Sequence, residues 1–189
     1  MKKQFAIGLI VPLKEEFGYI NDVAPVVETL PYDRTYLYRL HFGKLSVIAC
    51  IVGEMGPLLA SQAMTRLLSY ASVKLIVLLG LAGALDPAIR LGDVVIGREI
   101  NEFLAESKTV PSASGFQFTY SGRHWPLDYA IREAVNHFDL PGNASVEHWH
   151  TAVKTHYDGL STHMRSELCH WPPQTHIGPI ASGDIVGAS

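Results

Sequence analysis

The amino-acid sequence predicts an α/β fold, in which strands and helices alternate around a sheet. Two continuous apolar runs, Phe5–Val11 and Leu75–Leu79, have the pattern of strands that are buried on both faces of a parallel sheet. A helical pattern follows the first run after Pro12, and the small residues of 80–84 follow the second. Because ligands of open α/β sheets bind outside the carboxyl ends of strands, these two strand ends are the first candidates for a site.

The composition is that of a soluble globular domain. The 189 residues are 48% hydrophobic and 17% charged, which is enough apolar content for a core. The net charge of −3 indicates no basic surface that would attract nucleic acid or an anionic membrane. The first apolar run meets Pro12 and then charged residues, so it is too short for a signal peptide or a membrane span. The two cysteines, Cys50 and Cys169, suggest reduced thiols. We expect a cytoplasmic protein without nucleic-acid or membrane partners.

The elements of the first half follow from local signals. Pro12 closes the first strand, and a helix begins at Leu13–Phe17 with Glu15 and Glu16 in its first turn, where the helix dipole favours carboxylates. Helix-start chemistry alone accounts for both glutamates. The segments 36–40 and 45–52 have the pattern of a hairpin around Phe42–Lys44.

A second helix is predicted after Gly53–Gly56, because Pro57 stands where a first helical residue should. Its apolar residues recur at helical spacing and form a stripe that would pack on the sheet: Leu59, Ala63, Leu67 and Tyr70. Three strand ends, at Pro12, Gly53–Gly56 and Gly80–Ala84, therefore each deliver a loop. This pattern predicts a cleft along one edge of the sheet.

The second half is less regular. Val94–Ile96 is a predicted strand, and the Ser/Gly/Pro-rich segment Pro111–Gly115 is expected to be a surface loop. Pro126 is expected to open a helix that ends at Pro141–Asn143. The segment Ile177–Asp184 has the pattern of a further apolar strand, which ends in Ser-Gly-Asp.

Six of the nine histidines lie between Glu147 and His176: His148, His150, His156, His163, His170 and His176. Their spacing matches no zinc signature, and no cysteine or acidic pair recurs at ligand distance. We therefore expect a surface insertion at about 147–176, with a metal site as the alternative. His148 and His150 alternate around Trp149, which suits the edge of a strand equally well.

Five segments, taken together and in order, resemble the nucleoside phosphorylase/nucleosidase superfamily: IGLIVPLKEE from Ile7, GEMGP, LLGLAGAL, IRLGDVVIG and GPIASGD. This superfamily includes purine nucleoside phosphorylases, uridine phosphorylases and methylthioadenosine/S-adenosylhomocysteine nucleosidases. The resemblance implies a twisted mixed β-sheet flanked by helices in three layers, formed by residues 1–189 as a single domain. It also implies that the C-terminal part of the family domain is missing.

The resemblance implies cleavage of the N-glycosidic bond of a purine, adenosine-like nucleoside, without a cofactor or a metal ion. Glu16 matches the acidic residue that orients the attacking water in the nucleosidases. The other matching positions would bind the substrate: Met55 and Gly56 at the ribose and its 5′ substituent, Leu81, Ala82 and Gly83 at the base and ribose, and Ser182, Gly183, Asp184 and Val186 in the base pocket. Members commonly form dimers or higher oligomers, and we expect a homodimer or higher homo-oligomer here.

Departures from the family pattern bear on the reaction. The phosphorylases carry arginines on the first loop and before the glycine-rich loop, whereas this chain has Lys14 and apolar residues there, which favours hydrolysis. Leu81 stands where several nucleosidases have a small polar residue, so contacts at that position would come from the backbone. Asp184 is expected to cap a turn rather than act as an acid.

Two alternatives remain open. Phosphorolysis is one, because Lys14 could contact a phosphate. The other is an inactive nucleoside-binding or interaction module, because the Met-Glu and Ser-Asp pieces that follow the Ser-Gly-Asp strand in the family do not occur here. A dinucleotide-binding domain is disfavoured, since no G-x-G-x-x-G segment follows a predicted strand.

Overall fold

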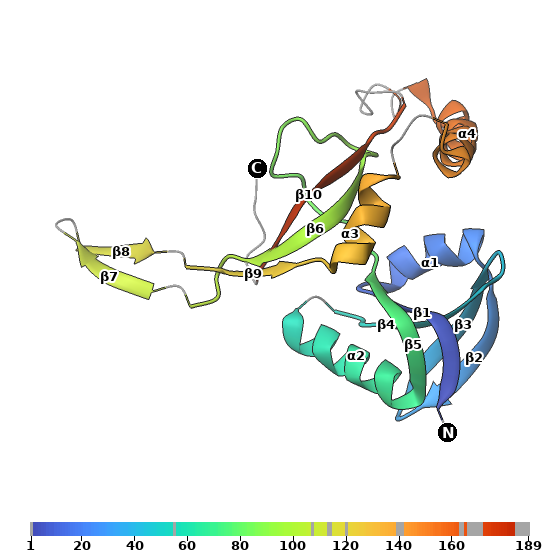
Figure 1. Ribbon diagram of the computed structural model, residues 1–189, viewed down its shortest axis with the longest axis horizontal. Coiled ribbons are helices and arrows are strands. Elements are labelled where there is room, and N and C mark those ends of the chain that lie inside the picture. Colours follow the sequence, from blue (N-terminus) through green and yellow to red (C-terminus); the bar gives the residue numbers. More distant parts are fainter. Residues whose placement is uncertain are drawn as a thin grey trace. The chain divides into compact units, whose positions relative to one another are not determined.

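The computed structural model contains two compact units, Met1–Ala82 and Gly83–Ser189, drawn in Figure 1. It describes residues 2–54, 56–106, 108–112, 115–119, 121–138, 142–162, 165 and 172–183. Each unit combines strands with helices, so the predicted α/β class is confirmed. Among the described residues, none of the helices has the length and apolar character needed to cross a membrane.

The first unit is a five-stranded mixed sheet with the strand order β2-β3-β4-β1-β5. Its elements are β1 (Lys3–Val11), α1 (Lys14–Val23), β2 (Val26–Tyr32), β3 (Thr35–Phe42), β4 (Leu45–Ile51), α2 (Pro57–Tyr70) and β5 (Ala71–Leu78). Strand β1 lies between β4 and β5 and is parallel to both. The strands β2, β3 and β4 pair antiparallel. The carboxyl ends of β1, β4 and β5 therefore meet at one edge of the sheet.

The two helices of this unit pack on opposite faces of the sheet. Side chains alternate along β4, and Ile48 and Cys50 belong to one buried cluster with Ala63 and Leu67 of α2. The intervening residues Val47 and Ala49 belong to a second cluster, to which α1 contributes Phe17 and Ile20. The first unit is thus a three-layer arrangement, as the resemblance implies.

Most of the elements predicted for the first unit are confirmed, including the helix that Pro57 begins. Strand β2 was not predicted, because its sequence, VVETLPY, lacks a strict alternation and includes Pro31. The prediction that Leu75–Leu79 is buried on both faces is wrong. Because β5 is an edge strand of its sheet, Leu78 is 63% exposed.

In the described residues, the second unit forms a three-stranded sheet, a separate two-stranded hairpin and the two helices α3 and α4. Its elements are β6 (Val94–Glu102), β7 (Lys108–Ser112), β8 (Gly115–Thr119), β9 (Arg123–Pro126), α3 (Tyr129–Asn136), α4 (Ala144–Gly159) and β10 (Thr175–Ser182). Strand β6 is central, parallel to β10 and antiparallel to β9. The predicted strand that ends in Ser-Gly-Asp is therefore confirmed as β10, up to Ser182.

Two predictions for the second unit need correction, and the structure decides one alternative. The expected loop Pro111–Gly115 instead contains the end of β7 and the start of β8, two antiparallel strands. The helix predicted after Pro126 is present as α3, but Pro126 ends β9 and the helix begins three residues later. Asp128 is its N-cap and accepts a hydrogen bond of 2.9 Å from the Ala130 N–H. His148 and His150 lie on α4, where Asn143 supplies the N-cap, and not on a strand.

Candidate active site

Glu16 is the buried carboxylate at the carboxyl edge of the first sheet. Glu16 is the third residue of α1 and is only 9% exposed. Its Oε2 atom accepts a hydrogen bond of 2.9 Å from the backbone N–H of Leu13, the N-cap residue. This contact is the glutamate half of a capping box, formed here without a polar side chain at the N-cap. One carboxylate oxygen is therefore fixed by the start of its own helix.

The second oxygen of Glu16 is fixed by a distant part of the chain. Oε1 accepts a hydrogen bond of 2.7 Å from the backbone N–H of Leu81, which lies 65 residues later in the loop after β5. The loop is held there because the Leu79 N–H donates a hydrogen bond of 3.0 Å to the Ile10 carbonyl and so continues the β1–β5 pairing. Glu16 thus bridges the ends of two neighbouring parallel strands.

A cavity of about 130 Å³ opens beside this carboxylate. It is lined by residues of α1 and of the loop after β5: Glu16, Tyr19, Ile20, Leu79, Gly80 and Leu81. Glu16 is the ionisable acid among them, whereas Tyr19 and Leu81, which are 74% and 86% exposed, supply an aromatic and an apolar wall. The sequence prediction missed Tyr19 and Ile20, although their spacing of three and four residues from Glu16 places them on its helix face.

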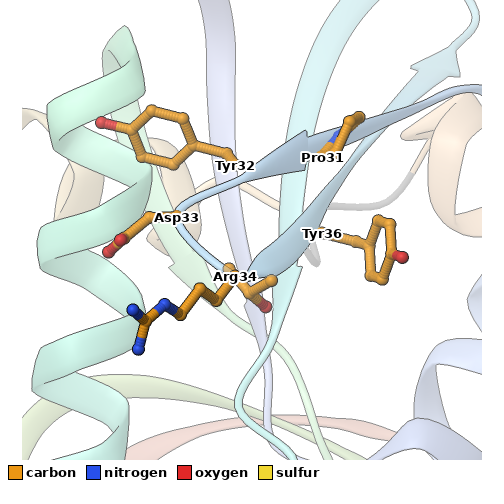
Figure 2. Close-up of a pocket in the computed structure, with 6 residues that line it drawn as sticks. Pro31, Tyr32, Asp33, Arg34 and Tyr36 are labelled. Carbon is orange, nitrogen blue, oxygen red and sulfur yellow. The ribbon is translucent and has the colours of Figure 1, made fainter.

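A larger hollow, of about 340 Å³, lies at the tip of the β2–β3 hairpin and is lined by the consecutive residues Pro31–Tyr36. Figure 2 shows Tyr36 pointing away from Tyr32, Asp33 and Arg34. Asp33 forms an ion pair of 3.8 Å with Arg66 of α2, and the Tyr32 ring packs edge-on against Tyr70. These contacts secure a turn and bring no buried acid or base to the hollow. The smaller cavity beside Glu16 is therefore the better candidate.

The other predicted binding residues are distributed over the chain. Gly56 is the N-cap of α2, with a φ of 131° that favours glycine, and Ala82 is exposed next to Leu81. Gly83, Ser182 and Gly183 belong to the second unit. Met55, Asp184 and Val186 lie outside the described residues. The structure therefore brings Glu16 and Leu81 into contact and leaves the remaining assignments as predictions.

The end of β10 is closely packed within the second unit. Ser182, its last residue, pairs with Glu102 of β6. A side chain at Gly183 would place its Cβ 2.9 Å from Cε1 of Phe103 and 3.0 Å from Cδ1 of Leu104. Only glycine fits there without movement of its neighbours. Close packing therefore accounts for the glycine at position 183, in addition to its predicted role in binding.

Asp93, which stands in the Gly-Asp segment before β6, has a structural role. Its nearly buried carboxylate accepts hydrogen bonds from the backbone N–H groups of Gln174, at 2.8 Å, and Arg90, at 3.0 Å, and lies 2.9 Å from Nε2 of His176. Burial alone would raise the pKa of Asp93, but these three contacts outweigh it, and its pKa is lowered from the ordinary value. Asp93 therefore joins the starts of β6 and β10.

The histidine-rich stretch forms no metal centre within the described part of the chain, where no group of three His, Cys, Asp or Glu side chains could hold a metal ion. His148, His150 and His156 lie on α4, and the Trp149 and His150 rings are in contact, with centroids 4.8 Å apart. His163, His170 and Cys169 fall outside the described residues.

A family model described as the phosphorylase superfamily matches residues 6–186 of this chain. Among curated proteins, a 5'-methylthioadenosine/S-adenosylhomocysteine nucleosidase of Tolumonas auensis is 33% identical over 94 residues, which are 50% of this chain and 40% of that protein. The matched segment thus spans well under half of this relative.

Solved structures share the fold at low sequence identity. A methylthioadenosine/S-adenosylhomocysteine nucleosidase of Neisseria meningitidis, in complex with methylthio-immucillin-A, has a TM-score of 0.57 and 19% identity, over 97% of this chain and 65% of that one. The S. pneumoniae nucleosidase with a transition-state inhibitor has a TM-score of 0.62 and 18% identity, and the match covers 95% of this chain and 65% of that one. A futalosine hydrolase mutant of Helicobacter pylori has a TM-score of 0.62 and 16% identity, and the match covers 99% of this chain and 70% of that one.

Proposed function

The chain belongs to the phosphorylase superfamily, and from this premise we propose that it is a nucleosidase that hydrolyses the N-glycosidic bond of an adenosine-like purine nucleoside. The observation that carries the proposal is the geometry of Glu16, a buried carboxylate whose two oxygens are each held by a backbone N–H beside a cavity. The proposed role of Glu16 is to orient the attacking water and to accept its proton.

The chemistry of the bond suits such a carboxylate. As the base departs, the sugar gains oxocarbenium character, and a water oxygen forms the new bond to the anomeric carbon while it loses a proton. A carboxylate oxygen has two lone pairs, so each oxygen of Glu16 can accept a hydrogen from water in addition to its backbone donor. The two N–H groups fix the direction of those lone pairs before substrate binds.

The surroundings of Glu16 favour water over phosphate as the nucleophile. The lining of the cavity combines one carboxylate with an aromatic ring, apolar side chains and backbone. A phosphate anion placed beside this carboxylate would be repelled unless a cation paired with it, whereas a neutral water would not be. Lys14 is the cation that could reverse this preference, since it is the first residue of α1 and exposed.

The proposed substrate class follows from the relatives. The T. auensis relative is a methylthioadenosine/S-adenosylhomocysteine nucleosidase, and two of the similar structures are nucleosidases of the same kind. We extend this substrate class to the present chain, with Gly56, Leu81, Ala82 and Gly83 as binding residues of the first loops. Further proposed contacts are Ser182 at the end of β10 and Gly183 after it, and also Met55, Asp184 and Val186.

The experiment that tests the proposal measures base release from adenosine, methylthioadenosine, S-adenosylhomocysteine, inosine and uridine, each with and without phosphate. Hydrolysis predicts release of adenine at the same rate in both buffers. Release that requires phosphate would identify a phosphorylase instead, and Lys14→Ala would then raise the KM for phosphate. Binding of nucleosides without release would identify an inactive binding module.

A further inference from the structure

We propose that Gly80 is a positioning residue for Glu16, because the missing side chain at this position leaves room for the carboxylate to reach the Leu81 N–H. The inference rests on the proposed role of Glu16 as a catalytic residue. It adds a residue that lines the cavity but has no side chain, and that acts by leaving room for the carboxylate.

Close neighbours leave no room for a side chain at position 80. A Cβ atom added at this position would lie 3.0 Å from Cδ and Cγ of Pro12 and 3.1 Å from Oε1 of Glu16. Gly80 is not among the residues with a positive φ, so its backbone conformation is open to any residue. A substitution by alanine is therefore a change in contacts rather than a change in backbone strain.

The two neighbours differ in how easily they move. Pro12 is a closed ring at the end of β1, and its carbonyl accepts a hydrogen bond of 2.9 Å from the Gly53 N–H, which fixes that segment. The carboxylate of Glu16 is the far end of a side chain with rotatable bonds. Relief of the contact therefore falls on Glu16, which would move by a few tenths of an ångström, away from the Leu81 N–H.

Such a displacement changes catalysis more than folding. Misplacement of a reacting group by about 1 Å can cost about a hundredfold in rate, so we expect a shift of a few tenths of an ångström in Gly80→Ala to lower kcat roughly threefold to tenfold. KM should change less than kcat, because the added Cβ faces Pro12 and Glu16 and Gly80 has no side chain with which to hold the substrate. A merely structural defect would instead reduce the amount of folded protein and leave kcat per folded molecule unchanged.

Gly18 provides the matched control. It lies on α1, two residues after Glu16, and a Cβ added there would meet nothing within 4 Å. Gly18→Ala should raise the midpoint of thermal unfolding slightly, because alanine is favoured over glycine inside a helix. It should leave kcat unchanged, since it adds a methyl group in solvent.

The decisive readout does not need turnover. In hydrogen exchange followed by NMR at neutral pH, the amide proton of Leu81 should be protected by its hydrogen bond to Glu16, and Glu16→Ala should remove this protection. The proposal predicts reduced protection of Leu81 in Gly80→Ala and unchanged protection in Gly18→Ala. Wild-type protection of Leu81 in Gly80→Ala overturns it. If the NMR result is as expected but the wild-type chain releases no base, positioning by Gly80 stands and the proposed function of Glu16 fails.

Discussion

The Oε1 atom of Glu16 and the backbone N of Leu81 are 2.7 Å apart and form a hydrogen bond that links the first turn of α1 to the loop after β5. The donor is the backbone of Leu81, and its side chain is 86% exposed. A small polar side chain at position 81 is therefore unnecessary for holding the carboxylate. Leu81 differs from the small polar residue of several nucleosidases, and this difference does not prevent position 81 from holding Glu16.

Glu16→Gln is expected to destabilise the protein as well as to affect activity. The carboxylate accepts from two N–H donors with two different oxygens, whereas a glutamine amide has one acceptor oxygen. One backbone N–H, of Leu13 or Leu81, then faces an NH₂ group and is left without an acceptor. We expect a loss of about 1–3 kcal/mol in the free energy of unfolding, measured by urea denaturation.

Glu15→Gln is the control for this loss, since Glu15 is the exposed neighbour in the same helical turn. It removes only a favourable interaction with the helix dipole, so its effect should stay below about 1 kcal/mol. Equal losses in the two variants would contradict the arrangement of Glu16 described above.

Asp93→Asn is expected to reduce stability at neutral pH and to flatten its dependence on acid. The amide offers one acceptor oxygen where the N–H groups of Gln174 and Arg90 bind different carboxylate oxygens, so we expect a loss of about 1–3 kcal/mol at pH 7. Because the pKa of Asp93 is lowered in the folded protein, its stabilisation is complete above the unfolded value, near 3.9, and is lost as the pH falls through the folded value.

The measurement is urea denaturation of both proteins between pH 7 and pH 3. The difference in the free energy of unfolding between wild type and Asp93→Asn should narrow below about pH 4, as the Asp93 carboxylate is protonated. A difference that is absent at pH 7, or that does not narrow below pH 4, would be inconsistent with the hydrogen bonds to Asp93.

Cys50 is expected to be unreactive in the folded protein. Burial raises the pKa of its thiol to about 11, so about one molecule in a thousand carries the reactive thiolate at pH 8. In a Cys169→Ser background, alkylation of Cys50 should be very slow in buffer and fast in denaturant. Rapid alkylation without denaturant would mean that β4 is not packed beneath α2 as described.

Leu67→Ala is expected to destabilise the first unit by about 2–5 kcal/mol, the range for removal of a fully buried leucine side chain. Leu67 is 0% exposed, and its Cδ2 atom lies 3.0 Å from the position that a Cβ on Gly8 of β1 would take. Leu58→Ala, on the same helix at 69% exposure, should cost less than about 1 kcal/mol. Thermal or urea denaturation of the two variants provides the comparison.

The elements around Glu16 could be predicted because their signals are local. The apolar run Phe5–Val11, the stop at Pro12 and Pro57 at a helix start each act over a few residues. Their spatial proximity followed from a general rule on the carboxyl ends of parallel strands. The strand ends at Pro12 and Gly80–Ala84, which were predicted to lie along one edge of the sheet, are linked by the contact between Glu16 and Leu81.

Other features depend on partners that the sequence does not reveal. The exposure of Leu78 follows from the position of β5 at the edge of its sheet, which strand order decides and local composition does not. The hairpin of β7 and β8 was read as a loop because Pro111 and Gly115 are turn residues, although both lie within paired strands. The need for glycine at position 80 comes from Pro12 and Glu16, which are distant in sequence.

The most direct test of the central claim is the kcat/KM for adenine release from methylthioadenosine in phosphate-free buffer, measured for the wild-type chain, Glu16→Gln and Glu15→Gln. If Glu16 orients water and accepts its proton, Glu16→Gln should lower kcat/KM by about 10²–10⁴-fold, the usual contribution of a general base. Glu15→Gln should stay within about threefold of wild type, since its side chain is exposed and lies outside the cavity lining. Adenine release by folded Glu16→Gln at the wild-type rate would contradict the account.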